Sequence, residues 1–204
     1  MLSASELELW RGDRLLFARL SFEVRAGEVL HVTGPNGIGK SSLLRVLAGL
    51  SRPETGTVHW GSDDVFKKTY GFYSALSYLG HRDGLKGELS ALDNLAFAAA
   101  LRPQGATSAD IAEAVAAVGL TAVDWLPLRQ LSAGQRRRVA ICRSLLARGA
   151  LWILDEPFSN LDTAGREWGH RRVAQHLTSG GLAIITSHHP LSIPGIAVRE
   201  LALG

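Results

Sequence analysis

The chain has 204 residues, of which 46% are hydrophobic and 20% are charged, and its formal net charge is +3. This length and composition fit one domain with a sizeable core and argue against disorder, while the small positive charge is an ordinary balance and not the basic stripe of a nucleic-acid binder. The single cysteine, Cys142, excludes a disulfide framework within the chain and a cysteine-based metal site.

The N-terminal part of the chain predicts antiparallel strands. Residues 1–30 alternate apolar and polar side chains, which is typical of strands with one buried face. The first ten residues have neither the basic start nor the apolar stretch of a signal peptide, and no run in the chain approaches the length needed to span a bilayer. A turn at Ala26-Gly27 leads into a predicted strand over residues 29–33.

A glycine-rich loop follows this strand and opens an apolar helix that ends near Gly49. Residues 56–80 have strand character, with strands predicted over 57–60 and 76–79. These elements place the glycine-rich loop between a buried strand and a helix, which is the context that matters for its chemistry.

The middle of the chain, from about Ser90 to Arg148, has a helical pattern. Alanine-rich segments over 91–101 and 108–118 are separated by the break Arg102-Pro103-Gln104-Gly105. After Ala150 strands and helices alternate again: a strand over 151–154, a helix around 164–177, a strand over 182–186 and a last strand over 196–203. Strands that alternate with helices predict an α/β fold with a largely parallel sheet.

The first motif with chemical content is Gly34-Pro35-Asn36-Gly37-Ile38-Gly39-Lys40-Ser41, which matches G-x-x-x-x-G-K-[ST] without deviation. Its glycines let successive backbone N–H groups point inward at a phosphate, and the helix N-terminus behind them adds partial positive charge. Lys40 is expected to reach the β- and γ-phosphates, and the Ser41 hydroxyl to ligate Mg²⁺. We expect this loop, together with Ser42, to hold ATP.

A second motif is an apolar strand that ends in Asp155-Glu156-Pro157. In a parallel sheet the carboxyl end of a strand faces the phosphate site. Asp155 is the candidate ligand of Mg²⁺, through water, and Glu156 is the candidate general base for the attacking water.

A third motif, Leu131-Ser132-Ala133-Gly134-Gln135, opens a predicted helix. A hydroxyl and a glycine at a helix start form a second anion site, and one nucleotide does not need two such sites in one chain. With these motifs in this order, the sequence resembles the ATP-binding-cassette (ABC) ATPases over essentially its whole length. The resemblance implies a P-loop NTPase core over 1–204, with an antiparallel β subdomain and a helical subdomain inserted at about 85–148.

The resemblance also implies roles for residues whose function cannot be worked out from their own chemistry and spacing. In the family the third motif binds the γ-phosphate of the ATP held by the partner subunit, so a head-to-tail homodimer is expected, with Ser132, Gly134 and Gln135 as nucleotide contacts. Leu161-Asp162 matches the family's dimer-contact loop, and His188 matches the histidine that contacts the γ-phosphate. Glu156, His188 and Lys40 are therefore the expected catalytic residues.

Three positions depart from the family pattern or match it loosely. Ala133 replaces a glycine, and its small methyl group leaves the loop intact. His81 stands where the family usually has a glutamine that touches Mg²⁺ or the attacking water and couples to the membrane subunit; a neutral imidazole can accept one hydrogen bond, so both roles are carried over to His81. Trp10 is the candidate for stacking on adenine, and the alternative is that it is a core residue of a strand.

A closer resemblance, to the ABC ATPases of bacterial cytochrome c maturation, rests on His81, on residues 85–95 and on Ser187-His188-His189-Pro190. It implies a peripheral subunit on the cytoplasmic face of the inner membrane, in complex with the membrane proteins CcmB, CcmC and CcmD. ATP would then drive haem export or the release of the haem-loaded chaperone CcmE.

Three alternatives remain open at this stage. The chain is the ATPase of an ABC transporter with a different cargo, a soluble ABC ATPase that works on ribosomes or DNA, or a nucleotide sensor with little hydrolysis. Soluble members usually carry two cassettes or a long coiled coil, and this chain has neither. The intact Lys40, Asp155, Glu156 and His188 argue against a sensor.

Overall fold

The computed structural model describes residues 1–67, 69–101 and 105–204, and its first layer is an antiparallel sheet with the strand order β2-β1-β4-β5. Its strands are β1 (Leu2–Arg11), β2 (Arg14–Val24), β4 (Thr55–Trp60) and β5 (Asp63–Asp64). Strand β1 pairs antiparallel with both β2 and β4. The antiparallel strands predicted for residues 1–30 are therefore confirmed.

The second sheet is parallel and has the strand order β6-β7-β8-β3-β9. Its strands are β3 (Val29–Thr33), β6 (Leu76–Leu79), β7 (Leu151–Asp155), β8 (Leu182–Thr186) and β9 (Val198–Ala202). This confirms the predicted parallel sheet. Because the carboxyl ends of parallel strands share one edge, the loops after β3, β7 and β8 emerge close together.

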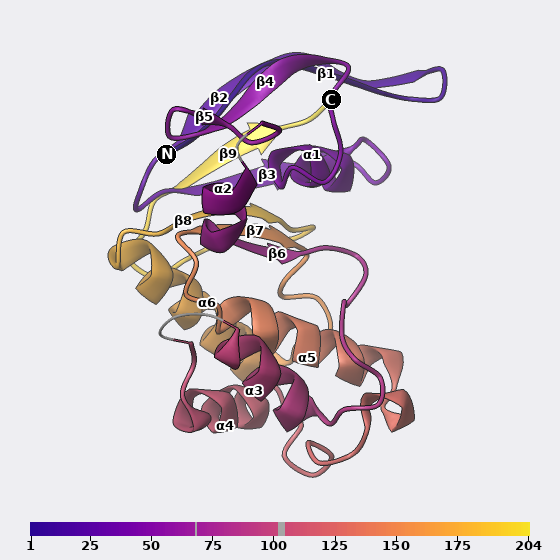
Figure 1. The fold of residues 1–204 in the computed structure, drawn as a ribbon, viewed down its shortest axis with the longest axis vertical. Helices are drawn as coiled ribbons and strands as arrows, with labels where there is room; N and C mark the ends of the chain where they lie inside the picture. The colour runs from indigo at the N-terminus through magenta and orange to yellow at the C-terminus, as the bar shows by residue number, and fades with distance from the viewer. Residues whose placement is uncertain (68, 102–104) are drawn as a thin grey trace.

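The helices divide between the two sides of the parallel sheet (Figure 1). Helix α1 (Lys40–Leu47) lies between the two sheets, and α2 (Thr69–Ala75) precedes β6. On the opposite side of the parallel sheet lie α3 (Ala91–Ala100), α4 (Ser108–Ala117), a 3₁₀ turn (Leu128–Gln130), α5 (Ala133–Leu145) and α6 (Thr163–Thr178).

Helices α3, α4 and α5 begin at capping boxes, which explains where they start. In α3, α4 and α5 the side chain of Ser90, Thr107 or Ser132 accepts a hydrogen bond from the backbone N–H three residues later. The side chain at that later position in turn bonds the N-cap backbone, so two otherwise unpaired donors are satisfied at each start.

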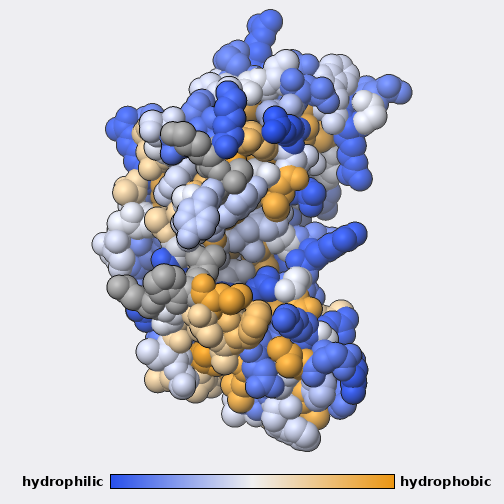
Figure 2. Space-filling model, viewed as in Figure 1, coloured by the Kyte–Doolittle hydropathy of each residue, from blue (hydrophilic) through white to orange (hydrophobic). Residues whose placement is uncertain are grey.

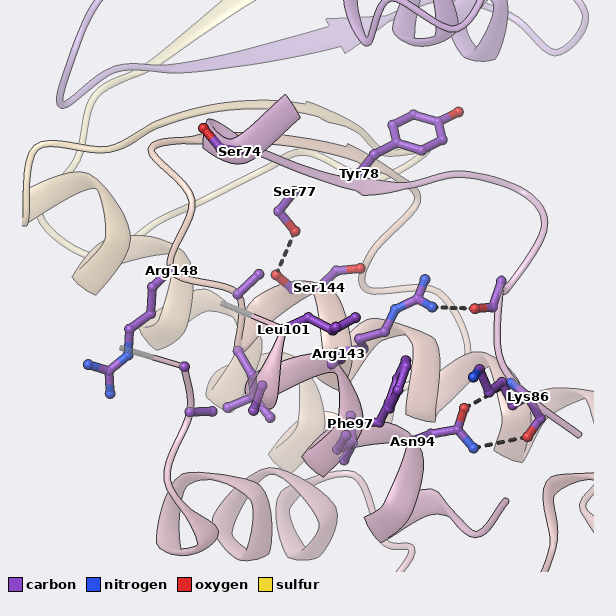
Figure 3. A pocket seen from close by; sticks show the side chains of 18 of the residues that line it. Ser74, Ser77, Tyr78, Lys86, Asn94, Phe97, Leu101, Arg143, Ser144 and Arg148 are labelled. Atoms are coloured by element: carbon purple, nitrogen blue, oxygen red, sulfur yellow. Dashed lines mark hydrogen bonds between the residues drawn. The ribbon is translucent and has the colours of Figure 1, made fainter. Parts of the chain in front are cut away.

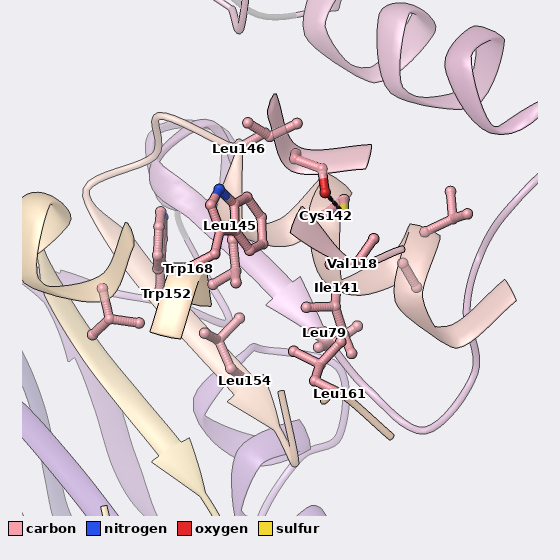
Figure 4. Close-up of a cluster of buried hydrophobic side chains, with 14 of the residues drawn as sticks. Leu79, Val118, Ile141, Cys142, Leu145, Leu146, Trp152, Leu154, Leu161 and Trp168 are labelled. Atoms are coloured by element: carbon pink, nitrogen blue, oxygen red, sulfur yellow. Dashed lines mark hydrogen bonds between the residues drawn. The ribbon is translucent and has the colours of Figure 1, made fainter. Parts of the chain in front are cut away.

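The core forms two clusters on the two faces of the parallel sheet, and residues alternate between them along each strand. On β7, Leu151 and Ile153 face the antiparallel sheet and α1, whereas Trp152 and Leu154 pack against the helices on the other side. Figure 4 shows this second cluster, in which Trp152, Trp168, Leu145 and the buried Cys142 meet.

Two expectations from the sequence need correction or stay open. The stretch 56–80, read as strands, contains helix α2, in which Phe72 is 2% exposed; burial of one aromatic face holds this short segment helical despite its strand-forming composition. Most of the predicted break over 102–105 lies outside the described residues.

No helix within the described ranges is both long and apolar enough to cross a membrane.

Candidate active site

The loop between β3 and α1 has the backbone geometry of a phosphate cradle. Gly34, Gly37 and Gly39 have φ angles of 136°, 77° and 120°. A Cβ atom at position 34 would lie 2.5 Å from the carbonyl oxygen of Leu203, so glycine is required there for steric reasons as well. Helix α1 begins without a side-chain cap, which leaves its first N–H groups available to an anion.

Lys40 is held inside this loop and is 8% exposed. Its Nζ donates hydrogen bonds to the carbonyl oxygens of Gly34, at 2.7 Å, and Pro35, at 3.1 Å. An ammonium group has three donors, so one N–H remains for a phosphate oxygen. The loop thus positions a cation and its own amides around one point.

A cavity of about 360 Å³ opens over this loop. Three parts of the chain line it: the start of β2 and the residues before it, the glycine-rich loop, and the segments that follow β7 and β8. The lining residues are Arg11, Arg14, Leu16, Asn36, Gly37, Gly39, Lys40, Ser41, Ser42, Asp155, Glu156 and His188. The structure therefore brings Lys40, Ser41 and Ser42 together with both predicted carboxylates and the predicted histidine.

Thr186, at the end of β8, orients the segment that carries the two carboxylates. Asp155 ends β7 and is 6% exposed, and its Oδ1 accepts a 2.7 Å hydrogen bond from Thr186 Oγ1 at the end of β8. The same hydroxyl oxygen accepts a 3.0 Å hydrogen bond from the Glu156 backbone N–H. Thr186 thus fixes the peptide that joins the two carboxylates.

Glu156 has the features of a group that holds a water molecule. Its φ angle is 51°, a left-handed conformation that strains a non-glycine residue by on the order of 1–3 kcal/mol. Its Oε1 is buried on the cavity wall, without a hydrogen-bond partner in the described residues, and lies 3.5 Å from His188 Nε2. A buried carboxylate oxygen is unfavourable unless a solvent or ligand group pairs with it.

The oxygen donors of the cavity suit Mg²⁺ arriving with a nucleotide. The Ser41 hydroxyl and the Asp155 carboxylate line the same cavity. Across the described ranges, no group of three or more histidine, cysteine, aspartate or glutamate residues forms a self-sufficient metal site. Mg²⁺ is usually held by one or two carboxylates together with substrate phosphates, so this donor set fits the ion in combination with ATP.

Several predicted site residues are not among the described lining of this cavity: Gly34, Pro35 and Ile38 within the glycine-rich loop, and His81 and Trp10 outside it. His81 is exposed and sits in the loop after β6. Trp10 lies on β1, is 42% exposed, and donates its indole N–H to Glu8 Oε1 at 2.7 Å. Its exposure excludes the alternative that Trp10 is a core residue; the residues of this region that line the cavity are Arg11, Arg14 and Leu16.

The third motif forms the start of α5, away from the lining of the cavity in the same chain. Ser132 Oγ accepts a 3.2 Å hydrogen bond from the Gln135 N–H, and Gln135 Oε1 accepts a 2.8 Å bond from the Ser132 N–H. Ser132 is exposed, and Gly134 is half-buried at the first turn of the helix. Within one chain, this helix start therefore lies outside the described lining of the cavity.

A second cavity, of about 570 Å³, lies between α2 and β6 on one side and α3 and α5 on the other (Figure 3). Lys86 Nζ lies 4.1 Å from the ring centroid of Phe97, and Arg143 donates to the carbonyl oxygens of Asp83, at 2.8 Å, and Gly84. In Figure 2 apolar side chains gather over α3, where Phe97 is 45% and Leu101 68% exposed. This second cavity is called the helical groove below.

Arg137 is a further residue whose role the sequence left undetermined. It lies in the run Arg136-Arg137-Arg138, and its side chain is 14% exposed. The guanidinium donates hydrogen bonds to the carbonyl oxygens of Gly80, at 2.6 Å, and Asp155, at 2.5 Å. It links α5 to the loop that carries His81 and to the end of β7.

Comparison with known proteins agrees with this geometry. A family model described as "ABC transporter" matches residues 17–159. The chain is 48% identical over 194 residues (95% of this chain, 94% of the relative) to the cytochrome c biogenesis ATP-binding export protein CcmA of Methylococcus capsulatus. It is 43% identical over 203 residues (100% and 96%) to the protein of that name from Shigella sonnei. A bacterial ABC transporter cassette solved as a dimer shares the fold, with a TM-score of 0.79, 20% identity and coverage of 99% and 94%.

Proposed function

The chain belongs to the ABC transporter family and is an ATP-binding ATPase of that family, and from this premise we propose that it powers bacterial cytochrome c maturation. In this role, ATP hydrolysis drives haem export or the release of the haem-loaded chaperone CcmE. The observation that carries the proposal is a cavity that joins Lys40, Asp155, Glu156 and His188, in a chain that aligns almost end to end with relatives named for cytochrome c biogenesis.

Binding uses the loop between β3 and α1. The N–H groups at the start of α1 and the Lys40 ammonium bind the β- and γ-phosphates of ATP. Arg11, Arg14 and Leu16 line the same cavity, and the base and ribose would lie on their side of it. Stacking of Trp10 on adenine remains a prediction. Because Trp10 is not among the lining residues of the cavity, its side chain would have to move toward the nucleotide to make this contact.

Hydrolysis uses the carboxylate end of the cavity. Glu156 Oε1 accepts a proton from a water molecule whose oxygen attacks the γ-phosphorus, and the bond between this phosphorus and the β–γ bridging oxygen breaks, giving ADP and phosphate. His188, whose Nε2 lies 3.5 Å from Glu156 Oε1, donates a hydrogen bond to the γ-phosphate. Bound Mg²⁺ would supply charge neutralisation on the phosphates, with Ser41 and Asp155 as the residues that hold it.

A homodimer completes each site. Ser132, Gly134 and Gln135 at the start of α5 are separate from the cavity of their own chain, and a helix start of this kind binds an anion. We propose that they contact the γ-phosphate held by a second copy, with Leu161-Asp162 at the contact. Two ATP molecules then lie between two chains, and hydrolysis releases the pair. Opening and closing of this dimer is the mechanical output.

The helical groove is the proposed docking surface for a membrane subunit, for which CcmB, CcmC and CcmD are the candidates. Among the described lining residues are Lys86, Arg143 and Arg148, beside Phe97 and Leu101, and no aspartate or glutamate. This chemistry suits a cytoplasmic segment with an apolar side chain flanked by an acidic one. Docking there would place the chain peripherally on the cytoplasmic face of the inner membrane.

His81 is proposed to couple this surface to the active site. It lies in the loop from Gly80 to Gly84, and Gly84 lines the helical groove. Arg137 binds Gly80 of the same loop and also Asp155. A docked segment that shifts this loop would therefore also move Arg137, which is bonded to Asp155 beside the catalytic Glu156. A direct contact of His81 with Mg²⁺ would require the loop to move toward the nucleotide.

The test is haem staining of periplasmic c-type cytochromes in a strain that lacks this gene, complemented with wild type, Lys40→Ala or Lys67→Ala. We expect the cytochromes to disappear in the deletion strain and to return with wild type and with Lys67→Ala, which alters an exposed lysine outside the cavity. Lys40→Ala should not restore them. Cytochromes that persist without the gene would replace this proposal with an ABC transporter of a different cargo.

A further inference from the structure

His31 is a buried polar side chain in the middle of the parallel sheet. It lies on β3, where its register partners are Ile185 on β8 and Glu200 on β9, and it is 2% exposed. Val29, Ala183 and Ile185, which share this face of the sheet, are apolar and buried. An imidazole among such neighbours is less favourable than an aliphatic side chain unless its nitrogens are paired, so packing alone does not explain it.

One ring nitrogen of His31 reaches the segment that follows β8. Its Nε2 lies 3.3 Å from the carbonyl oxygen of Ser187. Because a carbonyl oxygen can only accept, this hydrogen bond requires the proton to be on Nε2. The other nitrogen, Nδ1, has no hydrogen-bond partner in the described residues and lies 3.7 Å from Glu200 Oε1, on a side chain that is 64% exposed.

The Ser187 carbonyl belongs to the peptide that leads directly into His188. The orientation of this peptide sets where the His188 side chain leaves the backbone, and His188 Nε2 lies 3.5 Å from Glu156 Oε1. Thr186, the residue before Ser187, is held by its hydrogen bond to Asp155. His31 holds the next residue, Ser187, through its carbonyl oxygen, at the point where the chain leaves β8.

We propose that His31 is a positioning residue for ATP hydrolysis. It donates a hydrogen bond to the Ser187 carbonyl oxygen and so holds His188 where it can reach both Glu156 and the γ-phosphate. His31 does not touch the nucleotide, because it lies inside the sheet and outside the lining of the cavity. The inference rests on ATP hydrolysis at this site and is independent of the cargo.

The test is steady-state ATP hydrolysis by the purified full-length chain, with His31→Leu, His31→Gln and His31→Asn variants. Loss of one hydrogen bond at this site should lower kcat about tenfold in His31→Leu, with KM for ATP changed less than twofold, since the phosphate loop is untouched. The glutamine amide nitrogen can take the place of Nε2, so His31→Gln should stay near wild type. Asparagine is one methylene shorter, and His31→Asn should behave like His31→Leu.

A double-mutant cycle separates positioning from a structural role. If His31 acts through His188, His31→Leu should lower kcat by less than twofold in a His188→Ala background. Equal losses in both backgrounds, or equal kcat for His31→Gln and His31→Asn, would overturn the proposal. The two amide variants keep the test decisive if His31→Leu does not fold. Because the readout is hydrolysis in vitro, a failed cytochrome experiment leaves this outcome unaffected.

Discussion

Arg137 donates a hydrogen bond to the carbonyl oxygen of Asp155 over 2.5 Å, which ties the first turns of α5 to the end of β7. The same guanidinium donates to Gly80 over 2.6 Å. Arg137→Ala should leave two carbonyl groups without these charged donors, and charge-assisted hydrogen bonds each contribute about 1.5–3 kcal/mol. We expect the free energy of unfolding to fall by about 2–4 kcal/mol, measured by denaturant titration.

The control for this prediction is Arg171→Ala, on the exposed face of α6, where the change should stay within about 0.5 kcal/mol. Equal unfolding midpoints for Arg137→Ala and wild type would show that these short contacts contribute nothing net to stability.

Glu156→Gln should separate ATP binding from hydrolysis. The amide keeps the shape of the side chain but cannot accept the proton of the attacking water, so kcat should fall by about 10²–10⁴. ATP binding should persist, because the phosphate loop and Lys40 are unchanged. Size-exclusion chromatography with ATP should then show a stable dimer. Turnover at the wild-type rate would remove Glu156 from the role of general base.

Thr186→Val should disturb both carboxylates without changing the shape of the side chain. Thr186 is 0% exposed, and its hydroxyl donates to Asp155 Oδ1 and accepts from the Glu156 N–H. Each buried group left unpaired costs about 1–3 kcal/mol, so the variant should lose both stability and kcat. Thr186→Ser, which retains the hydroxyl, is the matched control. Similar kcat values for the valine and serine variants would contradict this role.

The phosphate loop, the parallel sheet and the helix starts were predictable because each depends on local chemistry: glycine spacing, alternation and capping residues. The roles of Thr186 and His31 were not predictable, because they depend on β8 lying between β7 and β3. The alternation of apolar and polar residues along a strand does not indicate which strands are its neighbours. Trp10 was ambiguous for a different reason. Strand β1 changes register between Leu9 and Trp10, so the face of a side chain cannot be counted along it.

The stability of the fold should decrease as the pH falls from neutral, partly because of His176. Its ring stacks on Trp152 at a centroid distance of 4.0 Å, and burial lowers its pKa below the ordinary value of about 6.5. The His176 ring therefore binds a proton more tightly in the unfolded chain than in the folded chain. The stability that depends on neutral His176 is fully present above about pH 6.5 and is lost as the pH falls through the lowered pKa of the folded state.

His176→Phe keeps the stack on Trp152 and removes the titration. The dependence of the unfolding free energy on pH, measured between about pH 5 and 7.5, should become shallower in this variant. Burial lowers the pKa of His170 as well, so the double variant with His170→Phe should be shallower still. An unchanged slope in the double variant would contradict the prediction.

Charge in the helical groove should control the biological output separately from ATP hydrolysis. Lys86 lies over the Phe97 ring, and Arg148 forms a 3.4 Å ion pair with Asp110 across the same region. Replacing Lys86 by Glu should repel the acidic segment that we expect to dock there, as should Phe97→Asp, which also removes an exposed apolar side chain. Both variants should retain ATP hydrolysis within about twofold, since neither residue lines the nucleotide cavity.

The readout is again haem staining in the deletion strain, together with hydrolysis by the purified variants. We expect cytochrome levels to fall at least about fivefold with Lys86→Glu and less with Lys86→Met, because the methionine loses the attraction without adding repulsion. Lys67→Glu, an equal charge change on an exposed side chain outside the groove, should leave cytochromes unchanged. If Lys86→Glu and Phe97→Asp both support normal cytochrome levels, the membrane subunit docks elsewhere. If hydrolysis falls in parallel with cytochromes, the groove acts through the fold and not through a partner.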